Sequence, residues 1–482
     1  MEMRLAIFKS WARMSVISLL LCAPFFALCG ALSPCKAIAQ SSQPNPIAQQ
    51  GSLPDITPNI VPNGAKEKHT PVRVLGDRLP EMPTIAASVT IPVVPLGFTA
   101  PGSIYLGQRN SMASLDFLGD DHLLFTFRVP GLIRRENGHK PGEDERQIRA
   151  VVVEVNTGRI EAEALWTVHD RSRYLWMLND GHFLLRDRDG LEQGDSSLVL
   201  KPSLQFPGPV EWLEMDPQQL YMVTNSNEPA KVEAKPGQVD SPPTAAVSME
   251  VDQQKTSPAA DPIASPPPDT VVRILERATG KVMLVSRTRS TVHLPVNATG
   301  YLERLRGNGQ TWMINLNYFT GGSRILGHVE SNCSPEFDFI SQGEFLVSGC
   351  AAWGGTRLVA FTIDGRRLWE EDAANSETWP ITVMSPDGSR LALETLVVSR
   401  PINAYNPIDS NDVKGQLVRI INAADGNIAL EIAASPPLDM GGNVAISPTG
   451  RRVAVLSDRA IQIVDLPAAP ALPASANTPA AR

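Results

Sequence analysis

Short stretches of alternating apolar and polar residues, separated by tight polar turns, fill most of the chain between residues 110 and 466. Alternation of this kind over four to eight residues is typical of half-buried β-strands. Almost no stretch keeps a helical period for more than two turns. The pattern therefore predicts an all-β body.

The predicted strands recur in a repeating unit. An apolar strand, a tight polar turn and a second strand follow one another seven times, with first strands at 115–118, 174–177, 210–213, 301–303, 337–339, 381–383 and 444–446. In four units a second hairpin follows, whose turn is Thr-Gly or Asp-Gly, at 151–166, 271–280, 358–369 and 418–426. Two hairpins make a four-stranded unit, and repeated units of this kind predict blades arranged around an axis.

Two kinds of segment carry a resemblance to known repeats. Residues 385–392 (Ser-Pro-Asp-Gly-Ser-Arg-Leu-Ala) and 447–454 (Ser-Pro-Thr-Gly-Arg-Arg-Val-Ala) resemble the blade turn of WD40-like and TolB-type β-propellers. The hairpins that end in Leu165-Trp166 and Leu368-Trp369 resemble quinoprotein-like (PQQ-like) propeller repeats. The resemblance covers residues 110–466 and implies a β-propeller of about seven four-stranded blades. These motifs specify a turn rather than an activity. The Trp-Asp dipeptide of true WD40 repeats is missing, and the unequal spacing leaves the blade count open by one.

The last unit lacks an outer strand, because the chain enters a Pro/Ala-rich tail after residue 464. An open ring would leave unpaired strand edges between the first and last blades. We therefore expect an N-terminal strand near Ser103–Gly107 to complete the last blade.

Three segments are too poor in apolar and aromatic residues to bury a core. Residues 40–97 are rich in Ser, Gln, Pro and Ala and predict a disordered stalk, and residues 226–269, with nine prolines, predict a disordered insertion. Residues 467–482 predict a disordered tail. The propeller is accordingly expected over residues 98–466.

Residues 1–39 have the pattern of a signal peptide. Three basic residues precede a charge-free stretch at 14–35, and Ala37-Ile38-Ala39 offers a cleavage site. The competing interpretations are an uncleaved membrane anchor, because the stretch is long enough to span a bilayer, and a lipoprotein signal. Pro24 and Pro34 interrupt the stretch, and no small residue precedes Cys29 or Cys35. We expect export to the periplasm or the extracellular space, with no later membrane span.

The net charge of the chain indicates which class of partner it can bind. The chain carries 43 Lys and Arg against 51 Asp and Glu, a formal net charge of -8. Removal of the signal takes away four basic residues and one acidic residue, so the charge becomes -11. Affinity for nucleic acid depends on Lys and Arg that contact phosphates, so this balance argues against a nucleic-acid partner.

Two of the five cysteines, Cys333 and Cys350, lie outside the signal. They flank a predicted hairpin with its turn at 341–343, which sets them nearly opposite each other at a separation typical of a disulfide. In an oxidising compartment the pair predicts a disulfide. Two free thiols are the alternative, and a metal site is disfavoured because His328 is the only histidine near them in sequence.

No strong catalytic motif occurs in the sequence. The Gly-x-Ser-x-Gly of serine hydrolases, the His-Glu-x-x-His of zinc proteases, Cys-x-x-Cys-His and the phosphate-binding P-loop are all missing. Quinoprotein dehydrogenases usually carry a vicinal cysteine pair, which this chain lacks. We therefore expect no catalytic, cofactor-binding or metal-binding residues.

Weaker candidates have simpler explanations. Asp120-Asp121-His122 and His169-Asp170 with His182 offer an acid/base pair or a metal site, but their place at tight turns favours backbone capping. Trp166 and Trp369 favour packing between blades over a ligand platform. Asn297-Ala298-Thr299 matches a glycosylation sequon, to which we assign no role.

Export, the repeats and the missing motifs favour a protein- or ligand-binding or scaffolding module of the bacterial envelope, with a protein or peptide partner. The alternative is a hydrolase or lyase acting on a glycan or peptide. A cluster of perturbed titratable groups at the central funnel would distinguish this enzyme. A third class is a structural spacer held away from the membrane by its Pro-rich segments.

Overall fold

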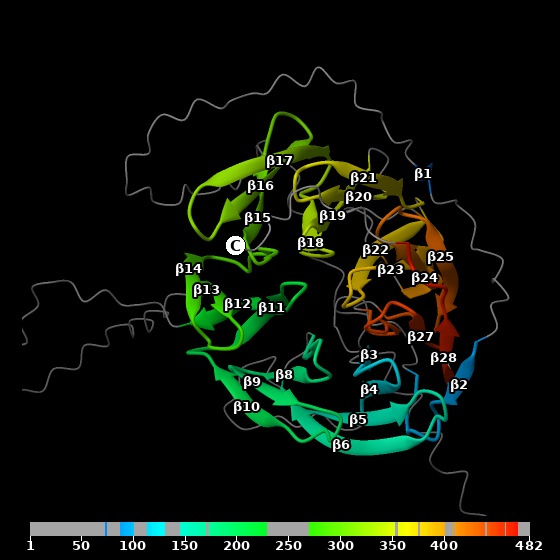
Figure 1. Ribbon diagram of the computed structural model, residues 1–482. Coiled ribbons are helices and arrows are strands. Elements are labelled where there is room, and N and C mark those ends of the chain that lie inside the picture. The colour runs from blue at the N-terminus through cyan, green and yellow to red at the C-terminus, as the bar shows by residue number, and fades with distance from the viewer. Residues whose placement is uncertain are drawn as a thin grey trace, which may run out of the picture. The chain divides into compact units, whose positions relative to one another are not determined.

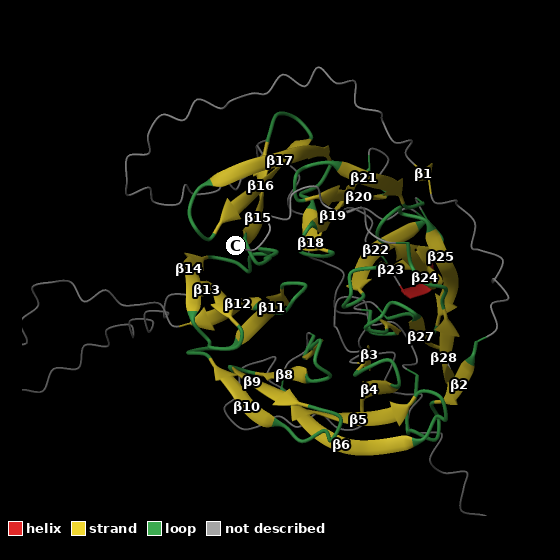
Figure 2. Ribbon diagram, in the orientation of Figure 1, coloured by secondary structure: helices red, strands yellow, loops and turns green. Residues whose placement is uncertain are grey.

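The structure is a computed structural model. It describes residues 73–74, 87–100, 113–130, 145–169, 173–228, 269–351, 355–374, 376–400, 408, 410–438, 441–457 and 459–470. The only helix in these segments is a single 3-10 turn, η1 (Ser410–Asp412), and nearly all other regular structure is strand (Figure 2). No helix in these segments is long and apolar enough to cross a membrane.

Seven antiparallel sheets follow one another around a centre, as the sequence repeats predict (Figure 1). The first blade holds β3 (Ala113–Phe117), β4 (His122–Arg128), β5 (Arg146–Glu154) and β6 (Ile160–Val168). The second holds β7 (Leu175–Met177), β8 (Phe183–Asp187), β9 (Gly190–Gly194) and β10 (Lys201–Gln205). The third holds β11 (Val210–Met215), β12 (Tyr221–Glu228), β13 (Asp269–Glu276) and β14 (Val282–Thr288).

The fourth blade holds β15 (Gly300–Arg306), β16 (Thr311–Tyr318) and β17 (Ser323–Glu330). The fifth holds β18 (Glu336–Phe339), β19 (Glu344–Cys350), β20 (Thr356–Thr362) and β21 (Arg367–Asp372), and β1 (Arg73–Val74) pairs in parallel with β21. The sixth holds β22 (Glu377–Met384), β23 (Arg390–Val398), β24 (Val413–Asn422) and β25 (Ile428–Ala434). The seventh holds β26 (Val444–Ile446), β27 (Arg452–Leu456), β28 (Ala460–Asp465) and β2 (Val89–Pro92).

The expectation of four strands in every blade is wrong for the fourth blade. Its sheet has the order β15-β16-β17. Only residues 331–335 separate β17 from β18, the first strand of the next blade. That connection is too short to hold a further strand as well as a return to the centre of the ring.

The core lies between neighbouring blades. One cluster joins the first blade to the last and contains Phe125, Phe127 and Ile463, all essentially inaccessible to solvent. Phe98, just after β2, packs edge-on against both phenylalanines, with ring centres 5.3 and 5.4 Å away. Stacked apolar layers of this kind hold the sheets in a ring, because each blade buries its two faces against its two neighbours.

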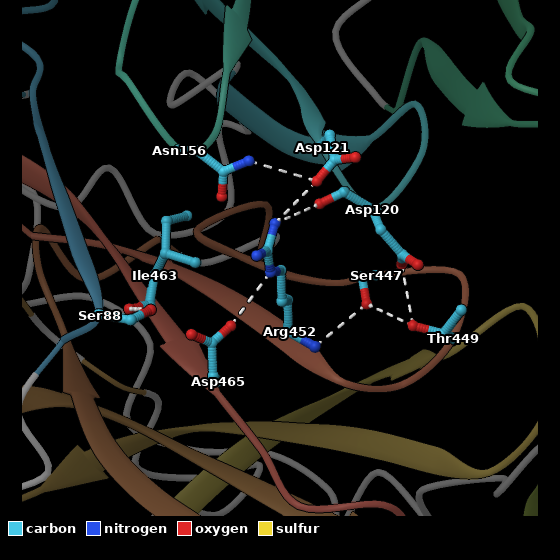
Figure 3. A network of polar contacts seen from close by, with 9 residues as sticks. All are labelled: Ser88, Asp120, Asp121, Asn156, Ser447, Thr449, Arg452, Ile463 and Asp465. Carbon is cyan, nitrogen blue, oxygen red and sulfur yellow. Dashed lines mark hydrogen bonds and ion pairs between the residues drawn. The ribbon is translucent and has the colours of Figure 1, made fainter.

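The ring is closed by an N-terminal strand, but at a different place from the one expected. β2 pairs antiparallel with β28, with Thr90 opposite Gln462, and the Ser88 hydroxyl donates a hydrogen bond of 3.1 Å to the Ile463 carbonyl (Figure 3). Ser103–Gly107 lies outside the described residues. The propeller therefore begins before residue 98, inside the stretch expected to be stalk.

Candidate functional site

Each blade places one residue of its first strand at an equivalent position near the centre of the ring. A backbone hydrogen bond closes the first turn of each blade. Examples are the bond from the Leu118 N–H to the His122 carbonyl and the bond from the Ile340 N–H to the Glu344 carbonyl, both 2.9 Å long. The residue two positions before this donor lies on the first strand, which is the innermost of the sheet (Figure 1). In blade order these residues are Asp116, Trp176, Glu214, Leu305, Asp338, Val383 and Ala445.

Three of the seven equivalent positions hold a carboxyl group, in the first, third and fifth blades. A partly buried carboxylate on an inner strand loses hydration, so it needs a partner or a proton. The pKa values of all three groups are raised, with burial as the largest cause. Three further charged side chains and one histidine gather with them. We call this set the axial cluster: Asp116, Arg173, Glu214, His293, Arg304, Glu336 and Asp338.

Asp116 and Arg173 form one side of the axial cluster. Burial raises the pKa of Asp116 to about 6, and a hydrogen bond from the Ser114 hydroxyl together with the charge of Arg173 opposes this rise. The pKa of Arg173 is lowered, mainly by burial, while the charges of Asp116 and Glu214 raise it. The Arg173 guanidinium lies 5.4 Å from the centre of the Trp176 ring, and its Nε donates to the Leu175 carbonyl at 3.0 Å. Although its guanidinium lies deep among the neighbouring side chains, the Arg173 residue as a whole is exposed at the surface, so a solute can reach this side.

Glu214 and His293 form a second side, together with Trp212 on the same strand as Glu214. Burial raises the pKa of Glu214 well above its usual range, and the charges of Asp338 and Glu336 raise it further. The His293 Nδ1 lies 3.3 Å from the Glu214 Oε2, and the two side chains are 22% and 16% exposed. Burial lowers the pKa of His293, so burial favours the uncharged form of both groups.

Asp338, Glu336 and Arg304 complete the axial cluster. Burial raises the pKa of Asp338 to about 6, the charge of Glu336 raises it further, and a hydrogen bond from Thr382 opposes the rise. Arg304 donates from Nη1 to the Pro335 carbonyl at 3.0 Å. Both Glu336 and Arg304 are exposed. A carboxyl with a pKa of about 6 can exchange a proton with a bound group near neutral pH.

The axial cluster does not have the composition of a metal site. Within the described segments, no group of three or more His, Cys, Asp or Glu side chains is arranged so that it could hold a metal ion. The two arginines among the carboxyls would also repel a metal cation. The arrangement suits an organic group that carries charge and hydrogen-bonding atoms.

Asp120 and Asp121 lie at the junction of the first and last blades (Figure 3). Arg452 Nη1 donates to the Asp120 carbonyl at 3.0 Å and to Asp121 Oδ1 at 3.1 Å, and its Nε donates to Asp465 at 3.1 Å. The Thr449 hydroxyl donates to the Asp120 carboxylate at 2.9 Å. These two acids therefore hold the ring closed, rather than capping only their own turn.

The histidines with Asp partners are also structural. His169 Nδ1 lies 3.0 Å from Asp187, and His182 Nδ1 lies 3.1 Å from Asp180, which also accepts from the His182 backbone N–H at 3.2 Å. The pairing of His182 with Asp180 is the turn capping that the sequence favours. Asp170 lies outside the described residues, and His122 contacts Glu161 at 2.9 Å.

Trp166 and Trp369 are packed between blades, as expected. Their residues are 5% and 3% exposed. Trp369 donates from Nε1 to the Ala423 carbonyl at 2.8 Å. Asn297 of the sequon is buried, and its Oδ1 accepts from the Gly300 backbone N–H at 3.0 Å, so its side chain is committed to a turn.

The structure contains the expected disulfide between Cys333 and Cys350, with the sulfurs 2.01 Å apart. It ties the short connection between the fourth and fifth blades to the end of β19. The Asn332 N–H donates to the Cys350 carbonyl at 3.1 Å, and the Ser331 hydroxyl donates to the Cys333 carbonyl at 2.7 Å. This connection leads directly into Glu336 of the axial cluster. A disulfide is compatible with an exported protein.

None of the axial residues is among the predicted site residues, although the sequence carries a signal for two of them. Asp116 and Asp338 each lie between two apolar residues of a first strand, at the same distance before its turn. A charged residue repeated at one position of a repeat is a sign of a shared surface. Arg173 and His293 lie on connections outside the repeated strands, so no comparable signal marks them.

The chain resembles known proteins only at low sequence identity. The sequence matches no protein-family model and no curated protein. The structure is similar to the acylaminoacyl peptidase of Pyrococcus horikoshii, with a TM-score of 0.41 and 9% identity over 71% of this chain and 49% of the peptidase. The chain thus spans about half the length of that peptidase.

Two further structures are similar over nearly their whole length. The β-propeller domain of the trilobed protease from Pyrococcus furiosus has a TM-score of 0.39 and 10% identity over 74% of this chain and 94% of that domain. Hydrazine synthase from Kuenenia stuttgartiensis has a TM-score of 0.39 and 7% identity over 77% of this chain and 99% of the other. These are likenesses of fold and assign no activity. The chain is a seven-blade β-propeller with a mixed cluster of acidic, basic and histidine side chains at the centre of its ring.

Proposed function

We propose that this chain is an exported propeller that binds a protein or peptide partner of the bacterial envelope at its axial cluster. The observation that carries the proposal is the repeated carboxyl position in the first, third and fifth blades, where Arg173, His293 and Arg304 meet the three acids. Charged and aromatic groups that converge from several elements are typical of a binding site. Partly exposed groups with shifted pKa values are frequent at functional sites.

Partner capture tests this function. The tagged protein is cross-linked in its native cells and purified, and partners are identified by mass spectrometry. The Asp116→Asn/Asp338→Asn variant is compared with the wild type and with a matched control, Asp120→Asn, which alters a carboxyl outside the axial cluster. Loss of the partner in the double variant alone supports the proposal. A partner that all three proteins capture equally contradicts it.

A second candidate function is a hydrolase or lyase acting on a glycan or peptide. The observation that favours it is the feature expected to distinguish such an enzyme: carboxyls with raised pKa values, Asp116, Glu214 and Asp338, lie in one cluster. Protonated carboxyls near neutral pH serve as general acids in such enzymes. Product formation from a peptide or glycan library, with a rate that falls in Asp338→Asn, supports the enzyme. A library left intact by the wild type, together with partner capture, supports the binding function.

A further inference from the structure

A group of buried polar side chains lies where the sixth blade meets the seventh. Glu394 on β23, Gln416 on β24 and Asn443, one residue before β26, are 0%, 3% and 0% exposed. The connection between the two blades is tied to them through the backbone of Pro436 and Leu438. We call these five residues the polar joint.

Every side-chain amide hydrogen of the polar joint already has an acceptor. Gln416 Nε2 donates to Glu394 Oε2 at 3.0 Å and to the Leu438 carbonyl at 3.3 Å. Asn443 Nδ2 donates to Gln416 Oε1 at 2.7 Å and to the Pro436 carbonyl at 3.2 Å. The Leu438 N–H donates to Gln416 Oε1 at 2.8 Å. These bonds fix which end of each amide is the oxygen, so no amide hydrogen is left to donate elsewhere.

Two acceptors of the polar joint have no donor. Glu394 Oε1 and Asn443 Oδ1 are shielded from solvent and have no hydrogen-bond partner in the part of the chain that the structure describes. Buried polar atoms are nearly always paired, so this pair of oxygens calls for an explanation. Both belong to groups that bond to the same Gln416 amide. A single proton on Glu394 Oε1, donated to Asn443 Oδ1, gives both atoms a partner.

The surroundings of Glu394 favour a proton on this carboxyl. The charged groups of the same sheet, Arg419 with Glu377 and Glu431, form ion pairs on the other face. Arg419 is opposite Leu393 in the register, and Leu393 and Glu394 point to opposite faces because they are neighbours on one strand. No charged group in the described segments shifts the pKa of Glu394, and burial alone raises it to about 8. The neutral carboxyl is therefore the favoured form at neutral pH.

The polar joint is one residue away from a contact with the first blade. The carbonyl of Gly442, which precedes Asn443, accepts a hydrogen bond of 2.9 Å from the Leu115 N–H on β3. The backbones are so close that a Cβ on Gly442 would come within 2.2 Å of the Ala113 carbonyl oxygen. Leu115 in turn precedes Asp116 of the axial cluster. A movement of Asn443 therefore acts on the innermost strand of the first blade.

We propose that Glu394 is protonated in the folded protein and donates this proton to Asn443 Oδ1, so that the polar joint stays closed until Glu394 ionises. On ionisation the proton passes to solvent, and two oxygens without a donor are left side by side, one of them charged. The need of the carboxylate for water then separates Asn443 from Glu394. The contact between Gly442 and Leu115 becomes sensitive to alkaline pH as a result. This device does not depend on the partner proposed above.

Nuclear magnetic resonance of the full chain tests the proposal. The carboxyl carbons of glutamate are labelled with carbon-13, the Glu394 resonance is assigned with Glu394→Gln, and it is followed from about pH 5 to about pH 10. The backbone amides of Leu438 and Leu115 are followed in the same titration. We expect Glu394 to titrate near pH 8 and both amides to shift with the same midpoint. Asp116, with a pKa of about 6, gives Leu115 a separate transition at lower pH.

Three variants locate the proton. Glu394→Gln places an amide N–H where the carboxyl proton lies, so the transition near pH 8 should vanish from both backbone amides. Asn443→Ala removes the acceptor and should lower the Glu394 midpoint by about one pH unit, because a hydrogen bond to the neutral form is lost. Asp439→Asn is the matched control, since Asp439 is an acid of the same connection that lies outside the described residues. It should leave the Glu394 midpoint unchanged.

The inference is overturned if Glu394 is already ionised at neutral pH, as a water molecule donating to both oxygens would allow. It is also overturned if the Leu438 and Leu115 amides do not follow the Glu394 titration, or if they keep the transition near pH 8 in Glu394→Gln. An equal Glu394 midpoint in the wild type and Asn443→Ala would exclude Asn443 as the acceptor.

Discussion

Replacing Glu394 by glutamine should stabilise the protein at neutral pH and leave it unchanged in acid. Glu394 lies on β23 and is inaccessible to solvent. The Gln416 amide donates to its Oε2 at 3.0 Å, while its Oε1 has no hydrogen-bond partner in the described segments. Burial raises the pKa of Glu394 to about 8, and no charged group in the described part of the chain opposes this rise.

The magnitude follows from linkage. The unfolded chain releases this proton near pH 4.5, the ordinary value for glutamate, but the folded protein keeps it until about pH 8. Between these values the unfolded state has lost a proton that the folded state retains. The free energy of unfolding therefore falls as the pH rises, by about 1.4 kcal/mol per pH unit. At pH 7 the cost of Glu394 is about 3 kcal/mol.

Urea unfolding of the wild type and Glu394→Gln at pH 5, 6, 7 and 8 measures the difference. Asp116, Glu214 and Asp338 also have raised pKa values, so both proteins should lose stability as the pH rises. Only the difference between the curves isolates Glu394. The variant should gain little at pH 5 and about 3 kcal/mol at pH 7. Parallel curves across this range would refute the burial argument.

Four further predictions concern the frame that holds the axial cluster. Arg419→Met should cost about 3 to 5 kcal/mol in urea unfolding, because it leaves the buried Glu377 without the guanidinium now 2.5 Å away; a loss below 1 kcal/mol would contradict the argument. Ile91→Ala, in the closing strand, should cost about 2 to 5 kcal/mol, and unchanged stability would show that β2 does not close the ring. Reduction should add the mass of two hydrogens to the mature protein, and Cys333→Ser should lower stability by about 3 kcal/mol; an unchanged intact mass would exclude the disulfide. Replacing residues 229–268 with Asn-Gly should leave the melting temperature unlowered, since the residues on either side are directly paired across strands; a collapse of the fold would disprove this.

The architecture was predictable because it is local and repeated. Each blade turn is encoded by a few neighbouring residues, and seven copies reinforce one another. The closing strand was misplaced because Val89–Pro92 is short, ends in proline and lies in a Pro-rich stretch. An edge strand tolerates proline, since one side of its backbone needs no partner. The three-stranded blade was likewise not predicted, because the sequence pattern gives first strands at 301–303 and 337–339 but does not show that β17 extends to Glu330.

The axial cluster could not be assembled from the sequence. Asp116 lies between the apolar residues Leu115 and Phe117, and this pattern is equally typical of a position that faces solvent. Only closure of the ring brings the inner strands of the first, third and fifth blades to a common centre. The perturbed pKa values follow from that convergence, as the effect of Asp338 on Glu214 shows. The pKa of each group would be shifted less if only its own sequence neighbours surrounded it.

Fluorine NMR of the protein labelled with 5-fluorotryptophan tests most directly whether the axial cluster is the binding site. The Trp212 resonance is assigned with Trp212→Phe, and the partner identified by cross-linking is then added. We expect the Trp212 resonance to shift or broaden, while the resonances of Trp166 and Trp369, packed between blades, stay in place. A partner that binds with the Trp212 resonance unchanged would place its site elsewhere and contradict the account.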